Sequence, residues 1–498
     1  MASILSLDIG TTGVRALVVD SVSGQAQRIA YRELPNFFPE PGWVEQDPLE
    51  IWHLLIECLG ELVESGIERP VAVGITNQRE TVVLWNGKTG QPLVNAIVWQ
   101  DRRSTSICED LIEKGHQEII RQKTGLVIDP YFSASKLTWL MRNNVVSIDK
   151  DTLFGTVDTW IIWNLTGGVE KGNHVSEPSN ASRTLLYDIS KRSWSGELKA
   201  IFDVPQHILP KVQPSASNFG EITGTPFGVL NSTPITAVLG DQQSALFGQA
   251  CFESGSAKIT FGTGGFLLMN SGKTRPQPSE ELLTTIAWDL GEFGGVNYAL
   301  EGAIFSAGST IQWLRDGLGI IGAASETEAL ARSVDSSGGL TIVPAFTGLG
   351  SPWWDPNARG LITGITRGTT RAEFARAAIE SIAYQSADVV EAIKANYKEG
   401  IKVLKADGGA SVMDLLLQNL ADYTAVEVVR LKNSEATACG AAWLAGLHEG
   451  VWNSLDEIKL LLKDDKTFSP GLSEELRAKG SSVWKDSVTR SLGWEQAR

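Results

Sequence analysis

The 498-residue chain has only four cysteines and five histidines. Cys58, Cys108, Cys251 and Cys439 are far apart, form no C-x-x-C pair and have no histidine at zinc-site spacing. The histidines form no cluster either. The sequence therefore predicts reduced thiols, no zinc site and no histidine-based catalytic group.

Positive charge is also scarce, since 43 Lys and Arg face 58 Asp and Glu and the net charge is −15. No run of five basic residues is present, as a nucleic-acid or anionic-membrane partner would require. No apolar run approaches the roughly 18–20 residues that span a bilayer, and the first residues lack the basic and apolar regions of a secretory leader. We therefore expect a cytoplasmic protein with no nucleic acid and no membrane among its partners, while a local basic pocket for phosphate is compatible with this charge.

Short apolar stretches alternate with helical patterns, which indicates layered α/β domains. The chain opens with two apolar strands around the turn Gly10–Gly13, and a third strand is expected at 27–33. A second strand–turn–strand unit follows around Gly262–Gly265, half a chain length later. We therefore predict two domains of related build, residues 1–250 and 251–498.

Helical periodicity marks the longer helices. Asp47 is an expected N-cap for a helix over 48–66. The segment 436–447 is rich in alanine and glycine, so it can pack closely against a neighbouring element. The other expected helices are 133–142, 156–165, a helix from 242, 302–318 and 371–396, and the expected strands are 4–9, 14–19, 71–76, 81–85, 235–239, 259–261, 266–269 and 403–406.

The first turn combines small residues with charged ones. Glycine and threonine let backbone N–H groups and hydroxyls approach phosphate, Arg15 can balance the charge, and Asp8 at the strand end can hold a hydrated Mg²⁺. An ordinary hairpin turn explains the same residues. The similar turn around Thr263 favours the phosphate interpretation, because two facing loops can hold a nucleoside triphosphate.

Two further polar clusters follow apolar strands. Arg79 and Glu80 supply the donors and the acceptor that a small polyhydroxy ligand requires, and a surface ion pair is the alternative. Asp241, after the strand 235–239, can accept a proton from a substrate hydroxyl, and a helix N-cap is the alternative. The residues alone indicate a two-domain α/β protein with a candidate nucleotide cleft, and they leave the substrate open.

These motifs, together with others in the same order, resemble the FGGY family of carbohydrate kinases almost from end to end. The resemblance implies two ribonuclease-H-like domains of the actin/hexokinase ATPase type with an interdomain cleft. It also implies phosphorylation of glycerol to sn-glycerol 3-phosphate by ATP, assisted by Mg²⁺. The segments that carry the resemblance are 8–12, 41–48, 74–81, 95–100, 124–133, 154–160, 180–184, 240–243, 298–302 and 344–350.

The resemblance also assigns roles at the matching positions. Asp241 matches the general base, and Asp8 and Asp241 match the carboxylates near Mg²⁺. The implied polyol contacts are Arg79, Glu80, Trp99, Tyr131, Asp241, Gln242 and Phe266, with Trp99 and Phe266 as an apolar wall. The implied nucleotide contacts are Thr11, Thr12, Gly13, Arg15, Thr263, Gly308, Gln312, Gly409 and Met413.

Some positions depart from the family pattern and leave alternatives open. Met413 stands where an asparagine pair is common near the adenine; methionine packs on a base but is a poor hydrogen-bonding substitute, so nucleotide preference stays open. The stretch 222–228 lacks the loop with which some bacterial members bind fructose 1,6-bisphosphate, so we expect no inhibition by that compound. An FGGY kinase for another polyol or ketose and a non-catalytic actin-like nucleotide-binding protein remain the alternatives. The resemblance suggests a homodimer or homotetramer.

Overall fold

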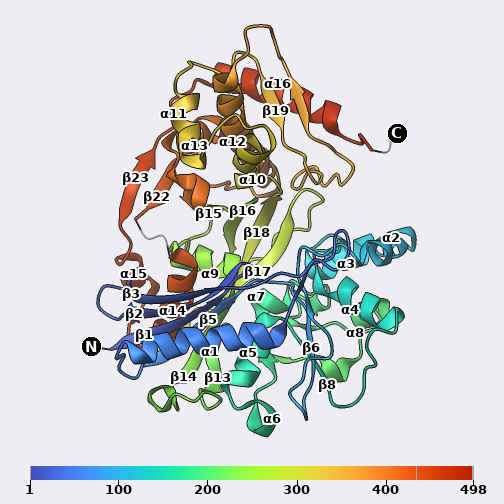
Figure 1. The fold of residues 1–498 in the computed structure, drawn as a ribbon, viewed down its shortest axis with the longest axis vertical. Helices are drawn as coiled ribbons and strands as arrows, with labels where there is room; N and C mark the ends of the chain where they lie inside the picture. The colour runs from blue at the N-terminus through green and yellow to red at the C-terminus, as the bar shows by residue number, and fades with distance from the viewer. Residues whose placement is uncertain (1, 433–434, 496–498) are drawn as a thin grey trace.

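The computed structural model describes residues 2–432 and 435–495, and each half of the chain builds one large sheet (Figure 1). In the first sheet, the first three strands in space are antiparallel neighbours. The next two run parallel to the third of them, and a further antiparallel strand forms the edge. In spatial order the strands are β3 (Ala26–Glu33), β2 (Gly13–Asp20), β1 (Ser3–Ile9), β5 (Ala72–Asn77), β14 (Pro234–Gly240) and β13 (Ala216–Glu221).

The second sheet repeats this arrangement. In spatial order its strands are β17 (Leu283–Asp289), β18 (Val296–Ile304), β16 (Gly265–Gly272), β15 (Ser256–Phe261), β21 (Val403–Asp407), β22 (Val428–Leu431) and β23 (Asp464–Phe468). β18, β16 and β15 are antiparallel, and β21 and β22 run parallel to β15. The order β18-β16-β15-β21-β22 is thus the counterpart of β3-β2-β1-β5-β14.

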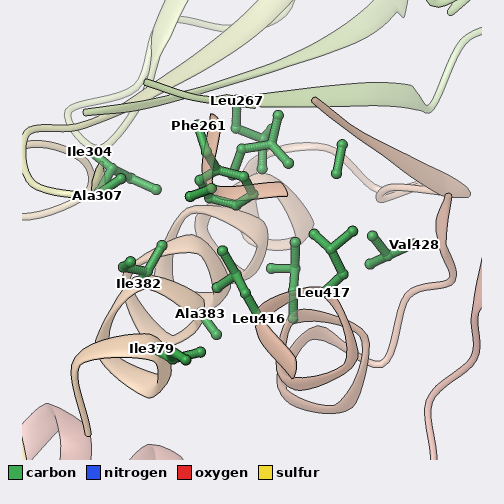
Figure 2. Packing of buried hydrophobic residues seen from close by; sticks show 14 of the residues in the cluster. Phe261, Leu267, Ile304, Ala307, Ile379, Ile382, Ala383, Leu416, Leu417 and Val428 are labelled. Carbon is green, nitrogen blue, oxygen red and sulfur yellow. The ribbon is translucent and has the colours of Figure 1, made fainter. Parts of the chain in front are cut away.

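Long helices cover the outer face of each sheet. α1 (Pro48–Glu64) and α5 (Val157–Leu165) share one buried cluster with the first sheet, and Asp47 caps α1 by accepting a hydrogen bond from the Leu49 backbone N–H. α12 (Arg371–Asn396) and α13 (Asp414–Thr424) cover the second sheet. Figure 2 shows side chains of these two helices packed beneath Phe261 and Leu267 of the strands.

Two further helices lie between the sheets. α9 (Asp241–Gly248) and α14 (Ala436–His448) pack on each other and on the first sheet, although α14 comes late in the chain (Figure 1). A Cβ built on Gly440 would lie 2.0 Å from the Ser244 carbonyl oxygen, and one on Gly248 would lie 1.8 Å from that of Ala436. The close packing expected from the alanine and glycine content of this segment is therefore confirmed.

The remaining elements are short or peripheral. The other helices are α2 (Thr105–Glu113), α3 (Gln117–Thr124), α4 (Ser133–Arg142), α6 (Gly168–Lys171), α7 (Pro178–Ala181), α8 (Gly196–Ile201), α10 (Gly308–Gln312), α11 (Thr327–Ala331), α15 (Leu455–Lys459) and α16 (Glu474–Ser491). Two-stranded pairs are β4 (Glu45–Gln46) with β7 (Ala96–Ile97), β6 (Val83–Asn86) with β8 (Thr152–Gly155), β9 (Val175–Ser176) with β12 (Lys211–Val212), β10 (Tyr187–Asp188) with β11 (Ser193–Trp194), and β19 (Thr341–Val343) with β20 (Leu361–Thr363). Within the described ranges, no helix is both long and apolar enough to cross a membrane.

One expected helix, 302–318, is wrong over its first part. Residues up to Ile304 belong to β18, which is paired on both sides and buried along Tyr298–Ile304. A strand buried on both faces has no polar alternation, so its apolar run cannot be told from a buried helix by periodicity. The helix begins only at Gly308, where the chain turns back over the loop after β15.

Candidate active site

The polar residues singled out in the first half gather because three neighbouring strands end together. β14, β5 and β1 are parallel, and Gly240, Asn77 and Ile9 stand side by side in register. The segments that follow these residues therefore leave the sheet at one edge, where ligands of α/β proteins commonly bind. This edge brings together Asp8, Arg79, Glu80 and Asp241, which are distant in the sequence.

Arg79 is buried, with 2% of its side chain exposed. Its Nε lies 3.2 Å from Asp241 Oδ1, and its Nη2 donates to the Tyr131 hydroxyl at 3.3 Å. Nη1 and Nη2 also donate to the two carboxylate oxygens of Glu301, at 2.8 and 3.1 Å. The alternative of a surface ion pair is therefore wrong, because this cation is enclosed and held by charged partners on two sides.

Glu80 is held in an uncommon backbone conformation, with φ at +61°. Such strain in a non-glycine residue persists only where surrounding contacts maintain it, and it is concentrated at functional sites. Ser133 Oγ donates to the Glu80 carbonyl at 2.9 Å, and Arg183 Nε donates to Glu80 Oε1 at 2.6 Å. Across residues 2–432 and 435–495, no hydrogen bond is made to the other carboxylate oxygen, which leaves it to a ligand.

Three aromatic side chains from separate segments form a wall beside these charges. The Trp99 ring lies 5.5 Å from that of Tyr131 and 6.2 Å from that of Phe266, both edge to face. Phe266 comes from β16, so both halves of the chain build the wall. Trp99 Nε1 also donates to Thr11 Oγ1 at 2.9 Å, which ties the wall to the first turn.

Asp241 is the first residue of α9, and Gly240 is the N-cap. The N-cap interpretation of Asp241 is therefore wrong. Asp241 Oδ1 accepts a hydrogen bond from the Gln242 backbone N–H at 2.7 Å, and Gln242 Oε1 accepts one from Lys258 Nζ. Since 29% of the Asp241 side chain remains exposed, the carboxylate is oriented and still reachable.

Asp8 is a buried carboxylate with incomplete compensation. Burial raises its pKa to about 6, Arg15 opposes the rise, and the negative charges of Asp241 and Glu435 add to it. Arg15 Nε lies 3.9 Å away, while Arg15 Nη1 is drawn to Glu435 at 2.8 Å. Arg15 is thus shared between Asp8 and Glu435, and Asp241 adds a further negative charge near Asp8. This arrangement favours a further cation.

The second turn is held by the chain that enters α10. The backbone N–H groups of Ala307 and Ser309 donate to the Thr263 carbonyl, and that of Gly308 donates to the Gly262 carbonyl, each at 3.0 Å. A Cβ on Gly308 would lie 2.5 Å from the Gly262 oxygen, so only glycine permits this approach. Thr263 itself is exposed, and Gln312 is exposed at the end of α10.

The remaining predicted nucleotide residues lie at the end of β21. Gly408, with φ at +86°, lies against the backbone of Phe261, and Gly409 beside it is exposed. This proximity places Gly409 near the second turn. Met413, by contrast, is buried in the core cluster of the second sheet.

Comparison with known families decides the identity of the fold. The model of the FGGY family of carbohydrate kinases, N-terminal domain, matches residues 3–248, and that of the C-terminal domain matches residues 257–448. The chain belongs to the FGGY family of carbohydrate kinases.

Curated relatives match this FGGY kinase over its full length. Glycerol kinase 2 of Thermotoga maritima is 49% identical, with 100% of both chains covered. Glycerol kinase of Deinococcus radiodurans is 48% identical, with 99% of this chain and 98% of the relative covered. A solved structure, Plasmodium falciparum glycerol kinase with ADP, superposes with a TM-score of 0.93 at 36% identity, covering 99% of this chain and 98% of that one. The expected two-domain fold of the actin/hexokinase type is confirmed.

Sequence reasoning missed two charged residues of this FGGY kinase that the structure brings to the site. Glu301 and Arg183 are fully buried; Glu301 pairs with both Arg79 and Arg183, and Arg183 pairs with Glu80. The sequence signal for Glu301 is that it is the one carboxylate inside the apolar run 298–304. This signal is recognisable only when that run is taken as a strand. Arg183 stands in the segment 180–184, which carried the family resemblance without an assigned role.

Proposed function

We propose that this FGGY kinase transfers the terminal phosphoryl group of ATP to glycerol, forming sn-glycerol 3-phosphate and ADP. Relatives at 48–49% identity over the full chain carry the name glycerol kinase, which supports this substrate. The observation that carries the proposal is the pairing of Arg79 with Asp241 beside the wall of Trp99, Tyr131 and Phe266. Charged hydrogen-bonding groups suit hydroxyls, and the aromatic wall suits the carbon side of a short polyol.

Asp241 acts in this proposal as the general base that accepts the proton of the attacking hydroxyl. Its carboxylate is oriented by Arg79 and by the Gln242 backbone, and it is partly exposed, so a hydroxyl can approach. Arg79, Glu80, Tyr131 and Gln242 orient the polyol. Phosphoryl transfer depends mainly on such positioning, because the enzyme has little covalent chemistry to perform.

The nucleotide binds in this proposal between the two turns. Thr11, Thr12, Gly13 and Arg15 approach its phosphates from the first sheet, and Thr263, Gly308, Gln312 and Gly409 approach from the second. Backbone N–H groups and hydroxyls on such turns bind phosphate oxygens well. Since the Met413 side chain is buried, we propose that it supports the Gly409 loop from beneath and makes no hydrogen bond to the base.

Mg²⁺ fits the residues at the end of the first sheet. Asp8 is buried with a raised pKa, and Asp241 adds a second negative charge beside it. No cluster of three or more histidine, cysteine, aspartate or glutamate side chains could hold a metal in the described ranges. Asp8 and Asp241 would therefore hold the ion together with water and nucleotide phosphates, as is usual for Mg²⁺. When bound, it offsets the charge of the phosphates.

The test is ADP release by the purified protein with ATP and Mg²⁺, in the presence of glycerol, dihydroxyacetone, erythritol, xylulose or no acceptor. Glycerol-dependent release that is lost when Mg²⁺ is chelated is the expected result. Release only with a larger acceptor would move the substrate elsewhere in the family. Release that ignores the acceptor would refute the proposal.

Assembly and location belong to the same proposal. We expect a homodimer or homotetramer in the cytoplasm, with the division between domains near residue 250. Sedimentation velocity of the purified chain measures the assembly directly, and a monomer at all concentrations would refute that part.

A further inference from the structure

Glu301 is an acidic side chain on β18, the second strand from one edge of the second sheet. Its strand neighbours are Leu268 on β16 and Leu283 on β17, and it is fully buried. An isolated buried carboxylate is costly, so it requires cationic partners. Both partners, Arg79 and Arg183, come from the other half of the chain. Although burial opposes its ionisation, Arg183 and Arg79 lower the pKa of Glu301 to about 2.

The five N–H groups of Arg79 can be accounted for one by one. Nη1 donates to Glu301 at 2.8 Å and to Gln243 Oε1 at 3.2 Å. Nη2 donates to Glu301 at 3.1 Å and to Tyr131 at 3.3 Å. The remaining group, on Nε, faces Asp241 at 3.2 Å. Glu301 therefore occupies both terminal nitrogens, and this fork fixes which edge of the guanidinium faces Asp241.

Arg183 extends the same arrangement to Glu80. Its Nη2 donates to Glu301 at 3.1 Å, its Nη1 lies 3.1 Å from the other Glu301 oxygen, and its Nε donates to Glu80 at 2.6 Å. Glu301 thus lies between two arginines, and each arginine holds one carboxylate of the candidate site. Without Glu301, two buried guanidinium groups would face each other, and like charges in a buried site repel.

We propose that Glu301 is a positioning residue of the polyol site, which sets the orientation of Arg79 toward Asp241 and, through Arg183, that of Glu80. This inference rests on the proposed glycerol kinase activity and extends it by adding to the polyol site, beside Phe266, a charged residue of the C-terminal half. Glu301 does not touch the substrate; it acts through the two arginines. The polyol site consequently requires the two halves to be docked, whether or not nucleotide is present.

The test replaces Glu301 by glutamine and compares KM values for the two substrates. Glu301→Gln keeps the size of the side chain but removes its charge and leaves one acceptor oxygen in place of two, so it cannot hold both terminal nitrogens of Arg79 in a fork. The KM for glycerol is expected to rise about tenfold or more and kcat/KM for glycerol to fall about 100-fold, while the KM for ATP changes less than about threefold. Asp388→Asn is the matched control: it removes a buried carboxylate of the same half, on α12, which accepts hydrogen bonds from Trp353 and Trp484, and it should change neither KM.

A second variant separates positioning from charge balance. Glu301→Gln combined with Arg183→Gln removes one charge of each sign, so it should fold even where the single variant does not. The same split between the two KM values is expected. An unchanged KM for glycerol in a folded variant, or equal changes in both KM values, would overturn the inference. Absence of glycerol-dependent ADP release by the unmodified protein would instead refute the proposed function.

Discussion

The two sheets share one strand order but exchange a pair of residues at their centres. In the first sheet Asp8 of β1 stands opposite Thr76 of β5, and in the second Thr260 of β15 stands opposite Asp407 of β21. The carboxylate has thus moved to the neighbouring strand. The same framework carries an acid at the matching place in both halves, in different surroundings: Asp8 is buried and Asp407 is partly buried.

The surroundings decide what each acid does. Burial keeps the pKa of Asp407 above its ordinary value, although the buried ammonium of Lys258 and a hydrogen bond from Thr260 oppose the rise. Lys258 is itself fully buried, and its pKa is lowered to about 8 by burial. Asp8, by contrast, has a half-exposed arginine at 3.9 Å and a second carboxylate nearby. Asp407 thus has a buried ammonium as its main compensating charge, whereas Asp8 has a half-exposed arginine and a further negative charge beside it.

Asp241 has no counterpart in the exchange of Asp8 and Asp407, and removing its carboxylate should have the largest effect on activity. Asp241→Asn keeps the shape of the side chain and its hydrogen bond to Gln242 but cannot accept a proton. We expect kcat to fall about 10²- to 10⁴-fold, the range for loss of a general base. Steady-state ADP release measures this, and the circular dichroism of the variant shows that it is folded. Wild-type turnover in a folded variant would remove Asp241 from the role of base.

Neutralising Asp8 should change activity and stability in opposite directions. The Asp8 pKa rises from 3.8 to about 6 on folding, so its contribution to stability is present below pH 3.8 and is lost as the pH rises through 6. At pH 7 the ionised group costs up to about 3 kcal/mol, the equivalent of that shift. Asp8→Asn should therefore stabilise the protein without ligands and reduce turnover strongly.

Asp407→Asn is the matched variant in the second sheet. The pKa of Asp407 is also raised, but the charge of Lys258 opposes the rise, so the variant loses a compensating interaction and should stabilise the protein less than Asp8→Asn does. Urea unfolding of both variants at pH 7 measures the two shifts. Equal stabilisation by the two variants would mean that their surroundings do not distinguish the two acids.

The sequence could predict the parts of this fold that depend on near neighbours. The turn Gly10–Gly13, the helix 371–396 and the Asp47 cap each follow from residues a few positions apart, and the structure has all three. The contact of Glu301 with Arg79 joins residues 222 positions apart and depends on how the halves dock, which no local pattern encodes. The expected helix 302–318 was wrong at residues 302–304, because the pairing of β18 with strands on both sides is not visible in the local pattern.

Disturbing the interface between the two sheets should have a smaller effect, a loss of stability that concerns both halves equally. Gly440→Ala places a methyl group 2.0 Å from the Ser244 carbonyl oxygen, where α9 and α14 cross. The helices must separate, which should cost about 1–3 kcal/mol. Gly196→Ala is the control, since nothing lies within 4 Å of its Cβ position. Thermal unfolding distinguishes the two, and an equal melting temperature for both variants would contradict the close crossing.

The smallest expected effect concerns two helices at matching places, where the halves are most alike. In chain order, α1 comes between β3 and β5 of the first sheet, and α12 comes between β18 and β21 of the second. Asp47 caps α1, and Thr370 caps α12 in a reciprocal pair with Glu373. Asp47→Ala and Thr370→Ala should each lower the free energy of unfolding by about 1 kcal/mol, the usual value of an N-cap. Asp47→Ser and Thr370→Ser should restore it, because serine also accepts the capping hydrogen bond. Because neither cap touches the candidate site, kcat and both KM values should stay unchanged. A cap variant that altered the KM for glycerol would mean that the helices transmit strain to the strand ends, so the two halves would differ in more than their central acids.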